Sequence, residues 1–522
     1  MQESIKLATF APSYLSFKIK SMANMNFSQF QIAIFNEVKN GTGNLAINAV
    51  AGSGKTTTIV ECCKLLHLNK YDVKFLAFNK SIVEELSVKI GNYADVSTLH
   101  SFGFNVIKKI NKRAKVNNRK YSNIIRDMVD SNNKNFVAIV NNASKLFNLC
   151  RVNLIKADNI TAINAICDEH SIVVLDNEIS IVNSLLKDCY ILDNDNPEVD
   201  FTDMLVLPLA YRRHIPAYKF VFIDECQDLN AAQRELMLAA AAKGRFIAVG
   251  DRNQAINGFA GADCNSFDKI ATLPNTKELP LSVNYRCGKS MIALAQQIVP
   301  QIQAHDKAIE GVVTHTNEIT LDLFKANDMV LCRSTAPLVA MCLKLIQAGV
   351  TAIVKGRDIA DGLINTIEKS KAKTIKGFES WVEIEKAKVV KDICKKDNIT
   401  PAEAEETGRY IAFMDRMNCI LTIGENVSKL DDVKAYIQQI FSDDNINNAV
   451  TLSTAHKSKG LESDRVVILL PEKLPLTWKH QLEWQYQQEL NLKYVALTRA
   501  KKELVFADTS LSDLLKVKFN NK

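Results

Sequence analysis

The sequence contains no long apolar run, no cysteine pair at metal-ligand spacing and no internal repeat. Its apolar stretches at residues 237–242 and 466–470 are far shorter than the roughly 18 residues that a membrane-spanning helix needs. We therefore exclude an integral membrane protein. The twelve cysteines stand singly except for the neighbours Cys62 and Cys63. Because no CxxC pair occurs, zinc-ribbon and thioredoxin-like sites are excluded as well.

A clear secretory leader is also missing. Residues 1–24 mix acidic and basic residues around a short apolar stretch that Pro12 breaks, whereas a signal peptide has a basic start and a clean apolar core. We expect a flexible lead-in over residues 1–24. Scattered cysteines are typical of buried thiols in a reducing compartment. We therefore expect a cytoplasmic protein, or one in the nucleoid or the nucleus, rather than a secreted one.

The composition is that of an ordinary globular protein. Of the 522 residues, 47% are apolar and 24% are charged, and at roughly 150 residues per domain this length predicts about three or four structural units. The formal net charge of +7 permits a nucleic-acid partner without demonstrating one. Its distribution is more informative, because seven positive charges and no acidic residue lie within residues 108–120. They are Lys108, Lys109, Lys112, Arg113, Lys115, Arg119 and Lys120.

Short β-branched and aromatic runs, bounded by turn residues, recur along the chain and predict buried parallel strands. Helical stretches separate several of them, which predicts an α/β fold with helices on both sheet faces. Two regions instead show helical spacing with few strand signals, and they indicate helical insertions into two α/β cores. The predicted strands are residues 45–50, 73–78, 220–223, 246–249, 329–331, 466–470 and 504–507. The predicted units are a first core (25–104 and 199–278), its insertion (105–198), a second core (279–356 and 445–522) and its insertion (357–444).

A glycine-rich segment follows the first predicted strand and opens a helix. It reads Ala51-Gly52-Ser53-Gly54-Lys55-Thr56, followed by Thr57. Glycines let the backbone wrap a phosphate, and the free N–H groups at a helix start supply donors and the positive end of the dipole. Lys55 would reach the β- and γ-phosphates, and the Thr56 hydroxyl would hold Mg²⁺. The first glycine of the general pattern is replaced by Ala49, but the strand–loop–helix context favours a phosphate site.

Two adjacent carboxylates, Asp224 and Glu225, follow the apolar run at residues 220–223. Asp224 can hold Mg²⁺ through water, while Glu225 can orient and deprotonate an attacking water. A solvated acidic turn is the alternative interpretation of such a pair. Together with the glycine-rich loop, the pair favours nucleotide hydrolysis.

These motifs resemble those of the UvrD/Rep-type DNA helicases of superfamily 1. The sequences of some of them are most similar to the F-box-helicase and phage-like branch. Asp224-Glu225-Cys226-Gln227-Asp228 is similar to the DExQD box of that family. The matches continue in family order from about residue 27 to about residue 504. In the first core they are Phe27-Ser28-Gln29-Phe30-Gln31, Phe75-Leu76-Ala77-Phe78-Asn79-Lys80, Thr98-Leu99-His100-Ser101-Phe102, Phe201-Thr202-Asp203-Met204, and Val249-Gly250-Asp251 with Gln254, Phe259 and Gly261-Ala262. In the second core they are Leu281-Ser282-Val283-Asn284-Tyr285-Arg286, Thr454-Ala455-His456-Lys457-Ser458-Lys459-Gly460-Leu461-Glu462 and Tyr494-Val495-Ala496-Leu497-Thr498-Arg499-Ala500.

The resemblance implies two RecA-like P-loop NTPase cores, each interrupted by a mainly helical insertion, with ATP and Mg²⁺ as cofactors. It implies that Gln31 reads the adenine edge, Tyr285 stacks on the base and Glu462 holds the ribose. Arg286 and Arg499 would reach the γ-phosphate from the second core. Such arginines stabilise transition-state charge only when the cleft is closed. Gln254 would sense the γ-phosphate and relay its loss to the DNA side.

The resemblance also implies single-stranded DNA and single-strand/duplex junctions as partners. Phe78 and Phe259 would be stacking platforms, because every base offers a π-face; core packing is the alternative for each phenylalanine. The further contacts implied with the strand are Asn79, His100 and Thr454. The first insertion contacts duplex DNA in the family, which would assign Lys108, Lys112 and Arg113 to DNA, although a basic run can also be a solvated helix face.

Three features depart from the family pattern. Asn257 and Ala260 stand where the family has Tyr and Arg, which predicts weaker or differently wired coupling between hydrolysis and strand movement. In the segment before the last motif, Gln488-Glu489-Leu490-Asn491, only Glu489 matches. The second insertion is also shorter than in the large bacterial repair helicases of the family. This puts in doubt whether rotation of the insertion regulates the activity, as the resemblance would imply.

The leading hypothesis is an ATP-dependent helicase that translocates 3′→5′ on single-stranded DNA. One alternative is a translocase that strips proteins from DNA with little unwinding. Another, of a different class, is a DNA-independent P-loop ATPase or scaffold, against which the second-core arginines argue.

Overall fold

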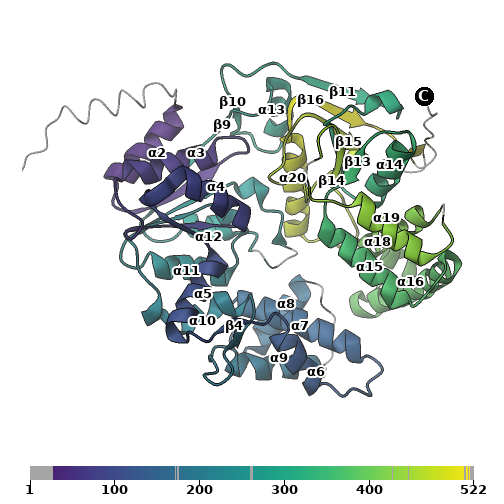
Figure 1. Ribbon diagram of the computed structural model, residues 1–522, viewed down its shortest axis with the longest axis horizontal. Helices are drawn as coiled ribbons and strands as arrows, with labels where there is room; N and C mark the ends of the chain where they lie inside the picture. The colour runs from purple at the N-terminus through teal and green to yellow at the C-terminus, as the bar shows by residue number, and fades with distance from the viewer. Residues whose placement is uncertain are drawn as a thin grey trace, which may run out of the picture.

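The computed structural model describes residues 27–170, 172, 176–258, 261, 263–425, 427–444, 446–510, 513, 514 and 517. The predicted lead-in at residues 1–24 lies outside them. Figure 1 shows two α/β bodies beside each other, with helices α6–α9 at the bottom of the view and α15–α19 at the lower right. Within the described ranges, none of the helices combines the length and the apolar character needed to span a membrane.

The first body is built on a six-stranded parallel sheet in the order β3-β2-β6-β7-β1-β8. Strands β2 and β7 are buried along their whole length, as expected for parallel strands covered on both faces. The bounds are β1 Asn44–Ala49, β2 Val73–Ala77, β3 Asp95–Thr98, β6 Phe220–Ile223, β7 Arg245–Gly250 and β8 Thr276–Leu281.

Helices cover both faces of this sheet. Leu45 and Ile47 of β1 pack with α2, α3 and α4, whereas Ala46 packs with α5, α10, α11 and α12, because successive strand side chains point to opposite faces. The helices are α2 Gln29–Asn40, α3 Lys55–Leu65, α4 Lys80–Ile90, α5 Leu99–Ile110, α10 Asp203–Ala210, α11 Ala231–Ala240 and α12 Ser266–Ala271. The short 3₁₀ turns are η1 Gly91–Tyr93, η2 Arg212–His214, η3 Cys226–Asp228 and η4 Arg252–Gln254.

A helical insertion lies between α5 and α10 and has its own buried core, in which Phe147 and Leu146 are fully buried. A two-stranded parallel pair, β4 with β5, joins its two ends. The elements are β4 Lys115–Val116, α6 Lys120–Met128, α7 Phe136–Val152, α8 Ile160–Glu169, α9 Asp176–Asp188 and β5 Glu198–Val199. The boundaries expected after residues 104 and 278 fall inside α5, which runs to Ile110, and inside β8, which pairs with β1 as far as Leu281.

The second body is a parallel sheet in the order β11-β16-β15-β12-β14-β13. One face packs on α13 and α20, and the other packs on α14 and on the second insertion. The elements are β9 Val283–Asn284, α13 Lys289–Gln296, β10 Gln303–Ala304, β11 Val312–Thr316, η6 Leu321–Leu323, β12 Met329–Cys332, α14 Ala336–Gln347, β13 Ala352–Val354, β14 Val450–Thr454, β15 Ser463–Leu469, η7 Pro471–Lys473, α20 Glu483–Leu497 and β16 Ala500–Ala507.

The second insertion follows β13 and is mainly helical, with one isolated bridge between Thr374 and Lys429 among its described residues. Its buried residues, such as Phe378 and Ile420, belong to the same apolar cluster as the second sheet, so the insertion is fused to its core. The helices are α15 Arg357–Ser370, α16 Ile375–Asp397, α17 Pro401–Glu405, α18 Gly408–Gly424 and α19 Leu430–Ile440.

The two bodies contact each other at the carboxyl end of β1. Val50, Ala51 and Ile256 of the first body are buried in one cluster with Leu492 and Tyr494 of α20. In open α/β sheets, ligands bind at the carboxyl ends of the strands. The fold therefore directs a candidate site to the cleft between the two bodies.

Candidate nucleotide cleft and nucleic-acid contacts

The glycine-rich loop has the backbone that a phosphate site requires. Gly52 and Gly54 have φ angles of 65° and 76°, a left-handed region that side chains other than glycine rarely adopt. Helix α3 begins directly afterwards, at Lys55. The Lys55 ammonium donates a hydrogen bond to the Ala49 carbonyl at 3.3 Å, which holds it over the loop. The helix dipole and this ammonium together favour an anion here.

The predicted acid pair lies at the end of β6, beside Lys55. Asp224 is only 5% exposed, and its Oδ1 accepts a hydrogen bond from the Glu225 backbone N–H at 2.8 Å. Burial raises the pKa of Asp224, and the neighbouring Glu225 carboxylate raises it further. Burial would also raise the pKa of Glu225, but Lys55 and Lys459 outweigh it and lower the pKa. Glu225 is therefore the ionised member of the pair.

A cavity of about 730 Å³ opens between the two bodies and brings most of the predicted nucleotide residues together. Of the predicted set, Gln31, Asp224 and Tyr285 do not line it. The lining residues are Gly52, Ser53, Gly54, Lys55, Thr56, Thr57, Phe78, Asn79, Ile82, Lys89, Glu225, Asp228, Gln254, Asn257, Arg286, His456, Lys459, Gly460, Glu462 and Arg499.

Hydrogen bonds from the second body reach the glycine-rich loop itself. The Tyr494 hydroxyl accepts from the Ala51 N–H at 2.8 Å, and Asn284 donates to the Ala51 carbonyl at 2.7 Å. The Tyr285 N–H donates to the Gly52 carbonyl at 2.8 Å. These bonds hold the two bodies together across the cleft.

The two predicted arginines reach the cleft by different routes. Arg286 forms an ion pair with Glu462, Nε to Oε2 2.6 Å, at the edge of the cavity. Arg499 is 2% exposed and donates to the carbonyls of Val495 at 2.9 Å and Leu461 at 3.0 Å. Burial lowers the pKa of Arg499 to about 10, and the nearby Arg286 contributes. Arg499 therefore remains charged at neutral pH, and both arginines line the same cavity as Lys55.

Lys459 crosses the cleft from the second body. Its ammonium forms an ion pair with Asp228, donates to the Gln254 carbonyl at 2.8 Å and lies 4.0 Å from a Glu225 oxygen. Burial lowers its pKa, but Asp228 and Glu225 raise it by more. The sequence gives Lys459 no role of its own. Its place in the motif at residues 454–462, which begins at the end of β14, is the signal that could have pointed to it. Its acidic partners are more than 200 residues away in the sequence, so no local pattern identifies them.

Gln254 is held in place by hydrogen bonds that centre on Asp251 of the first body. Its side-chain amide donates to Asp251 Oδ2 at 2.9 Å, and the same oxygen accepts from the Tyr494 hydroxyl at 3.2 Å. The Asp251 N–H donates to Gln227 Oε1 at 3.0 Å. A shift of Gln254 would therefore be felt at Tyr494 in the second body.

The residues that the resemblance assigns to adenine and ribose have protein partners in this structure. Gln31 closes a capping box with Ser28 and donates to the Thr58 hydroxyl at 3.0 Å. Tyr285 is 41% exposed, and its ring lies 4.8 Å from that of His305. Glu462 is paired with Arg286 and Lys501.

The donor set of the cleft fits a magnesium ion that arrives with phosphates. The described residues contain no group of three or more His, Cys, Asp or Glu that could hold a metal by itself. Mg²⁺ instead uses one or two carboxylates together with phosphates and waters. Asp224 offers a carboxylate whose pKa is raised by burial and by the neighbouring Glu225, and Thr56 offers a hydroxyl that lines the cavity.

The predicted strand contacts lie at different places. Phe78 is 41% exposed and lines the nucleotide cavity beside Asn79; the Asn79 side chain also caps α4. His100 is half-buried, and its ring meets the 55% exposed Phe201 edge-on at 6.0 Å. Thr454 is buried and accepts a hydrogen bond from the Lys457 N–H at 3.3 Å. Phe259, like Ala260 and Ala262, lies outside the described residues.

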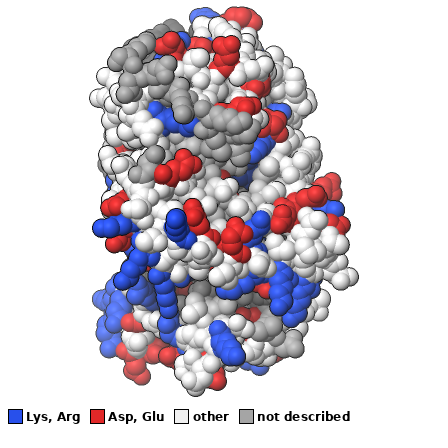
Figure 2. Space-filling model, turned by 90° about the vertical axis from the view of Figure 1, so that its right-hand side faces the viewer, with Lys and Arg blue, Asp and Glu red and all other residues white. Residues whose placement is uncertain are grey.

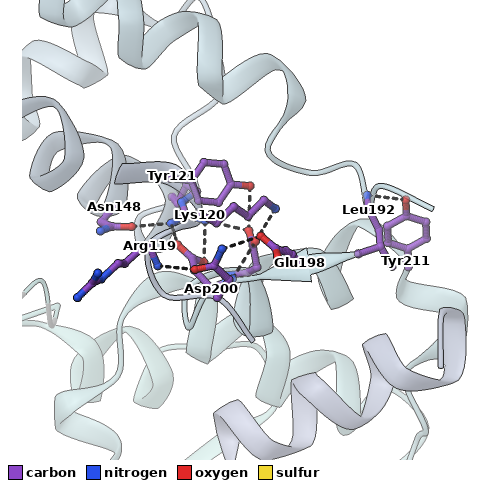
Figure 3. Close-up of polar contacts among 11 residues, drawn as sticks. Arg119, Lys120, Tyr121, Asn148, Leu192, Glu198, Asp200 and Tyr211 are labelled. Carbon is purple, nitrogen blue, oxygen red and sulfur yellow. Dashed lines mark hydrogen bonds and ion pairs between the residues drawn. The ribbon is translucent and has the colours of Figure 1, made fainter. Parts of the chain in front are cut away.

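A buried ion network fixes the first insertion to the start of α10 and to Asp200 just before it (Figure 3). The Arg151 guanidinium is fully buried between Asp200 at 2.5 Å and Asp203 at 2.9 Å. Asp203 also pairs with Lys120 at 2.9 Å and accepts from the Tyr121 hydroxyl at 3.1 Å. Although Asp203 belongs to a segment that resembles a strand contact, its carboxylate is committed inside the protein.

The basic run at residues 108–120 is partly neutralised. Lys115 pairs with Glu198 at 3.2 Å, and Lys120 belongs to the network just described. Arg113 donates to the Asn194 carbonyl at 2.6 Å, and Lys108 donates to the Lys112 carbonyl at 2.9 Å. Among the described residues, no carboxylate pairs with Lys108, Lys112 or Arg113. The Arg119 side chain points away from the network in Figure 3. Acidic side chains therefore do not neutralise the outward part of the run within the described structure.

Further basic side chains meet where the two insertions approach each other. Lys145 of α7 and Lys396 of α16 both have lowered pKa values, caused by burial first and by Arg409 of α18 second. In the described structure the Lys396 ammonium is buried without a hydrogen-bond partner. On the face drawn in Figure 2, Lys and Arg gather in the lower half. The two insertions thus bring Lys145, Lys396 and Arg409 close together.

Comparison with known proteins returns helicases. Residues 30–274 match the family described as UvrD/REP helicase N-terminal domain. The F-box DNA helicase protein 1 of Schizosaccharomyces pombe is 24% identical over 516 residues, covering 89% of this chain and 55% of that protein. The probable DNA helicase II homolog of Mycoplasma genitalium is 26% identical over 315 residues, covering 52% and 42%. The ATP-dependent DNA helicase Rep of Buchnera aphidicola is 26% identical over 294 residues, covering 49% and 41%. The chain spans about half the length of these relatives.

Proposed function

We propose that the chain belongs to the UvrD/Rep-type helicases of superfamily 1 and that it is an ATP-dependent DNA helicase that translocates 3′→5′ on single-stranded DNA. The observation that carries this proposal is the cleft between the two bodies. There, Lys55 and Glu225 of the first body face Arg286, Arg499 and Lys459 of the second. A small single-core ATPase or scaffold has no second body to supply those cations.

In the proposed reaction the first body binds the phosphates and prepares the water. The N–H groups of the glycine-rich loop and the Lys55 ammonium hold the β- and γ-phosphates. Thr56 and Asp224 would hold Mg²⁺, which would neutralise charge on the phosphates. Glu225, kept ionised by Lys55 and Lys459, accepts the proton of the attacking water. Gln254 contacts the γ-phosphate and responds to its loss.

The second body completes the site when the cleft is closed. Arg286 and Arg499 stabilise the charge that develops on the γ-phosphate, a contribution of about 10³- to 10⁵-fold in comparable enzymes. Gln31 and Tyr285 hold the adenine, and Glu462 holds the ribose. In this structure Glu462 is paired with Arg286 and Lys501. To bind the ribose it would have to release these ion pairs. ATP thus favours closure, and hydrolysis permits opening.

Stepping follows if a strand is bound by both bodies. Phe78, Phe259 and His100 of the first body and Thr454 of the second would contact bases or backbone. Aromatic faces tolerate any base, so the step does not depend on sequence. The outward charges of Lys108, Lys112 and Arg113 would hold the phosphates of the duplex ahead of the motor.

The test combines ATPase and unwinding measurements. Single-stranded DNA should raise ATP turnover, and a duplex with a 3′ tail should be unwound in preference to one with a 5′ tail. Lys55→Ala is the control that removes both activities. ATP turnover that does not respond to DNA would refute the motor, and unwinding of only the 5′-tailed duplex would refute the direction.

A second candidate function is a translocase that removes proteins from DNA and unwinds little. It is favoured by Asn257, which lines the nucleotide cavity at a position where the family has Tyr, and by the short second insertion. Displacement of a bound protein and displacement of a strand, measured side by side, distinguish the two candidates. Brisk unwinding by the isolated protein would remove this second candidate.

A further inference from the structure

The Gln31 side chain is held by a chain of hydrogen bonds that starts at the glycine-rich loop. The Thr58 hydroxyl donates to the Gly54 carbonyl at 2.9 Å, and the same hydroxyl accepts from the Gln31 side-chain amino group at 3.0 Å. At the other end of the amide, the Gln31 side-chain carbonyl accepts from the Ser28 N–H at 3.0 Å. Thr58 has no part in the proposed reaction. Its hydroxyl nevertheless joins the glycine-rich loop to the residue that the resemblance assigns to adenine.

These partners allow only one orientation of the amide. A backbone N–H can only donate, so the group that faces Ser28 must be the carbonyl. A hydroxyl has a single hydrogen, and that of Thr58 is used on Gly54, so the group that faces Thr58 must be the amino group. Turning the amide over would oppose two donors at Ser28 and two acceptors at Thr58. Because Gln31 is 5% exposed and Thr58 is fully buried, water cannot replace the lost partners, and the turned amide is disfavoured.

The amide keeps hydrogen-bonding capacity at both ends. An amide oxygen can accept two hydrogen bonds and an amino group can donate two, and in the described structure the Gln31 side chain uses one of each. One lone pair and one N–H remain for a ligand. Adenine presents a matching edge, with its N6 amino group as donor and N7 as acceptor, whereas guanine presents two acceptors, O6 and N7. With the amide fixed in this sense, the O6 atom of guanine would face the carbonyl oxygen of Gln31.

The amide lies beside the loop that would hold the phosphates. The Gln31 Nε2 atom is 3.9 Å from the position that a Cβ would take on Gly54. On the same loop, the Gly52 carbonyl accepts from the Tyr285 N–H at 2.8 Å, and Tyr285 is 41% exposed. The two residues that the resemblance assigns to the base therefore both adjoin the glycine-rich loop, one from each body.

We propose that Thr58 is a positioning residue that sets the preference for adenine over guanine by fixing the sense of the Gln31 amide. The inference rests on the proposed function, because it requires that Gln31 reads the base of the bound nucleotide. Thr58 acts through Gln31 and need not touch the nucleotide. The selectivity of the motor for ATP then depends on a buried hydroxyl of α3 as well as on the glutamine that meets the base.

The experiment measures kcat and KM of the full chain, with single-stranded DNA present, for ATP, GTP and 7-deaza-ATP, which lacks the N7 acceptor. The wild type should prefer ATP to both. Thr58→Val removes the hydroxyl and keeps the shape, and the N–H of residue 58 still donates to the Gly54 carbonyl at 2.9 Å, so α3 should begin as before. The preference for ATP in kcat/KM should fall by roughly 5-fold or more, because one two-point contact supplies about 5- to 150-fold of discrimination. The loss should appear in KM, with kcat for ATP little changed.

Two further variants separate positioning from a general structural effect. Thr58→Ser keeps the hydroxyl and should keep the preference for ATP. Thr366→Val is the matched control, because the Thr366 hydroxyl also donates to a glycine carbonyl four residues earlier, that of Gly362 at 2.8 Å, but in α15 of the second insertion; it should leave the preference unchanged. If Thr58→Val lowers kcat/KM for all three nucleotides by the same factor while Gln31→Ala changes their ratio, this inference alone is overturned. A wild type without a preference for ATP, or an unchanged ratio in Gln31→Ala, would refute both the base assignment of the proposed function and this inference.

Discussion

Replacing Lys459 with methionine should strongly lower the kcat of ATP hydrolysis without unfolding the protein. Lys459 is the cation that the second body inserts between Asp228, Glu225 and the Gln254 carbonyl of the first body. Its side chain is 17% exposed and that of Asp228 is 2% exposed, so water screens the pair poorly. Methionine keeps the length and the packing of the chain and removes only the charge.

The magnitude follows from the partner that is left behind. Removing one member of a buried ion pair costs about 3–5 kcal/mol, which corresponds to roughly 150- to 5,000-fold. Because this pair crosses the cleft, the cost falls on closure rather than on the fold of either body. Burial already raises the pKa of Asp228, and Lys459 is the main opposing influence. Without Lys459, Asp228 can take up a proton and recover part of the cost, so we expect a fall near the lower end, roughly 100-fold in kcat.

The assay is steady-state ATP hydrolysis at saturating ATP and single-stranded DNA. Lys457→Met is the matched control: Lys457 lies two residues away, is 42% exposed and pairs with Asp358 at the surface, where such pairs are worth about 0–1 kcal/mol. Its variant should stay within about fivefold of the wild type. In the double variant Lys459→Met, Asp228→Asn, residue 228 no longer carries a charge that lacks its partner, so the two costs should be non-additive by at least about 1 kcal/mol. Additive costs, or a Lys459→Met enzyme that keeps more than about one-tenth of the wild-type kcat, would refute this reasoning.

Four further outcomes follow from the structure. Lys55→Ala should abolish hydrolysis, and measurable turnover by this variant would remove Lys55 from the phosphate site. Arg499→Ala should slow turnover far more than it weakens ATP binding, whereas equal losses would contradict its role at the γ-phosphate. Arg151→Met should lower the free energy of unfolding by about 3–5 kcal/mol, because it removes the ion pair of the buried Asp200 and leaves Lys120 as the only cation paired with Asp203 among the described residues; a urea melt that shifts by less than about 1 kcal/mol would argue against the network. Burial raises the pKa of Asp224, so Mg²⁺ must displace a proton, and its affinity in the presence of ATP should rise from about pH 5 to about pH 8. Asp224→Asn should flatten that profile, and a pH-independent wild type would exclude Asp224 as a ligand.

The strands that the sequence predicts are those buried on both faces. Strands β6 and β7 are such runs, because helices cover both sides of the central sheet. The strand β8, Thr276–Leu281, is different: it lies at the sheet edge and pairs only with β1. Its charged residues face water and Pro280 is tolerated there, so a search for apolar runs does not find it. The same limit applies to the half-exposed β3, Asp95–Thr98.

The local half of the site could be read from the sequence, and the long-range half could not. Glycine φ angles and a helix start are properties of a few consecutive residues, so the loop before Lys55 is visible as a motif. The partners of Asp203 are not, since Arg151 is 52 residues away and Lys120 is 83 residues away. Charge patterns carry the same ambiguity: within one basic run Lys120 is neutralised internally while Lys112 remains exposed, and only the fold decides which.

The substitution at residue 257 gains a different meaning in the folded protein. From the sequence, Asn257 in place of Tyr predicts weaker coupling between hydrolysis and strand movement. In the structure Asn257 lines the nucleotide cavity, and its side chain hydrogen-bonds to Asp228, whose pKa is raised by burial. Asp228 is bound in turn by Lys459 of the second body, and the Ala255 carbonyl is bound by Asn491 of α20. The coupling segment is therefore tied to the second body directly at Ala255 and, through Asp228, at Asn257. Because an ion pair and a hydrogen bond already transmit its movement, we expect coupling in this chain to depend on Lys459 and Asn491 more than on the side chain at 257.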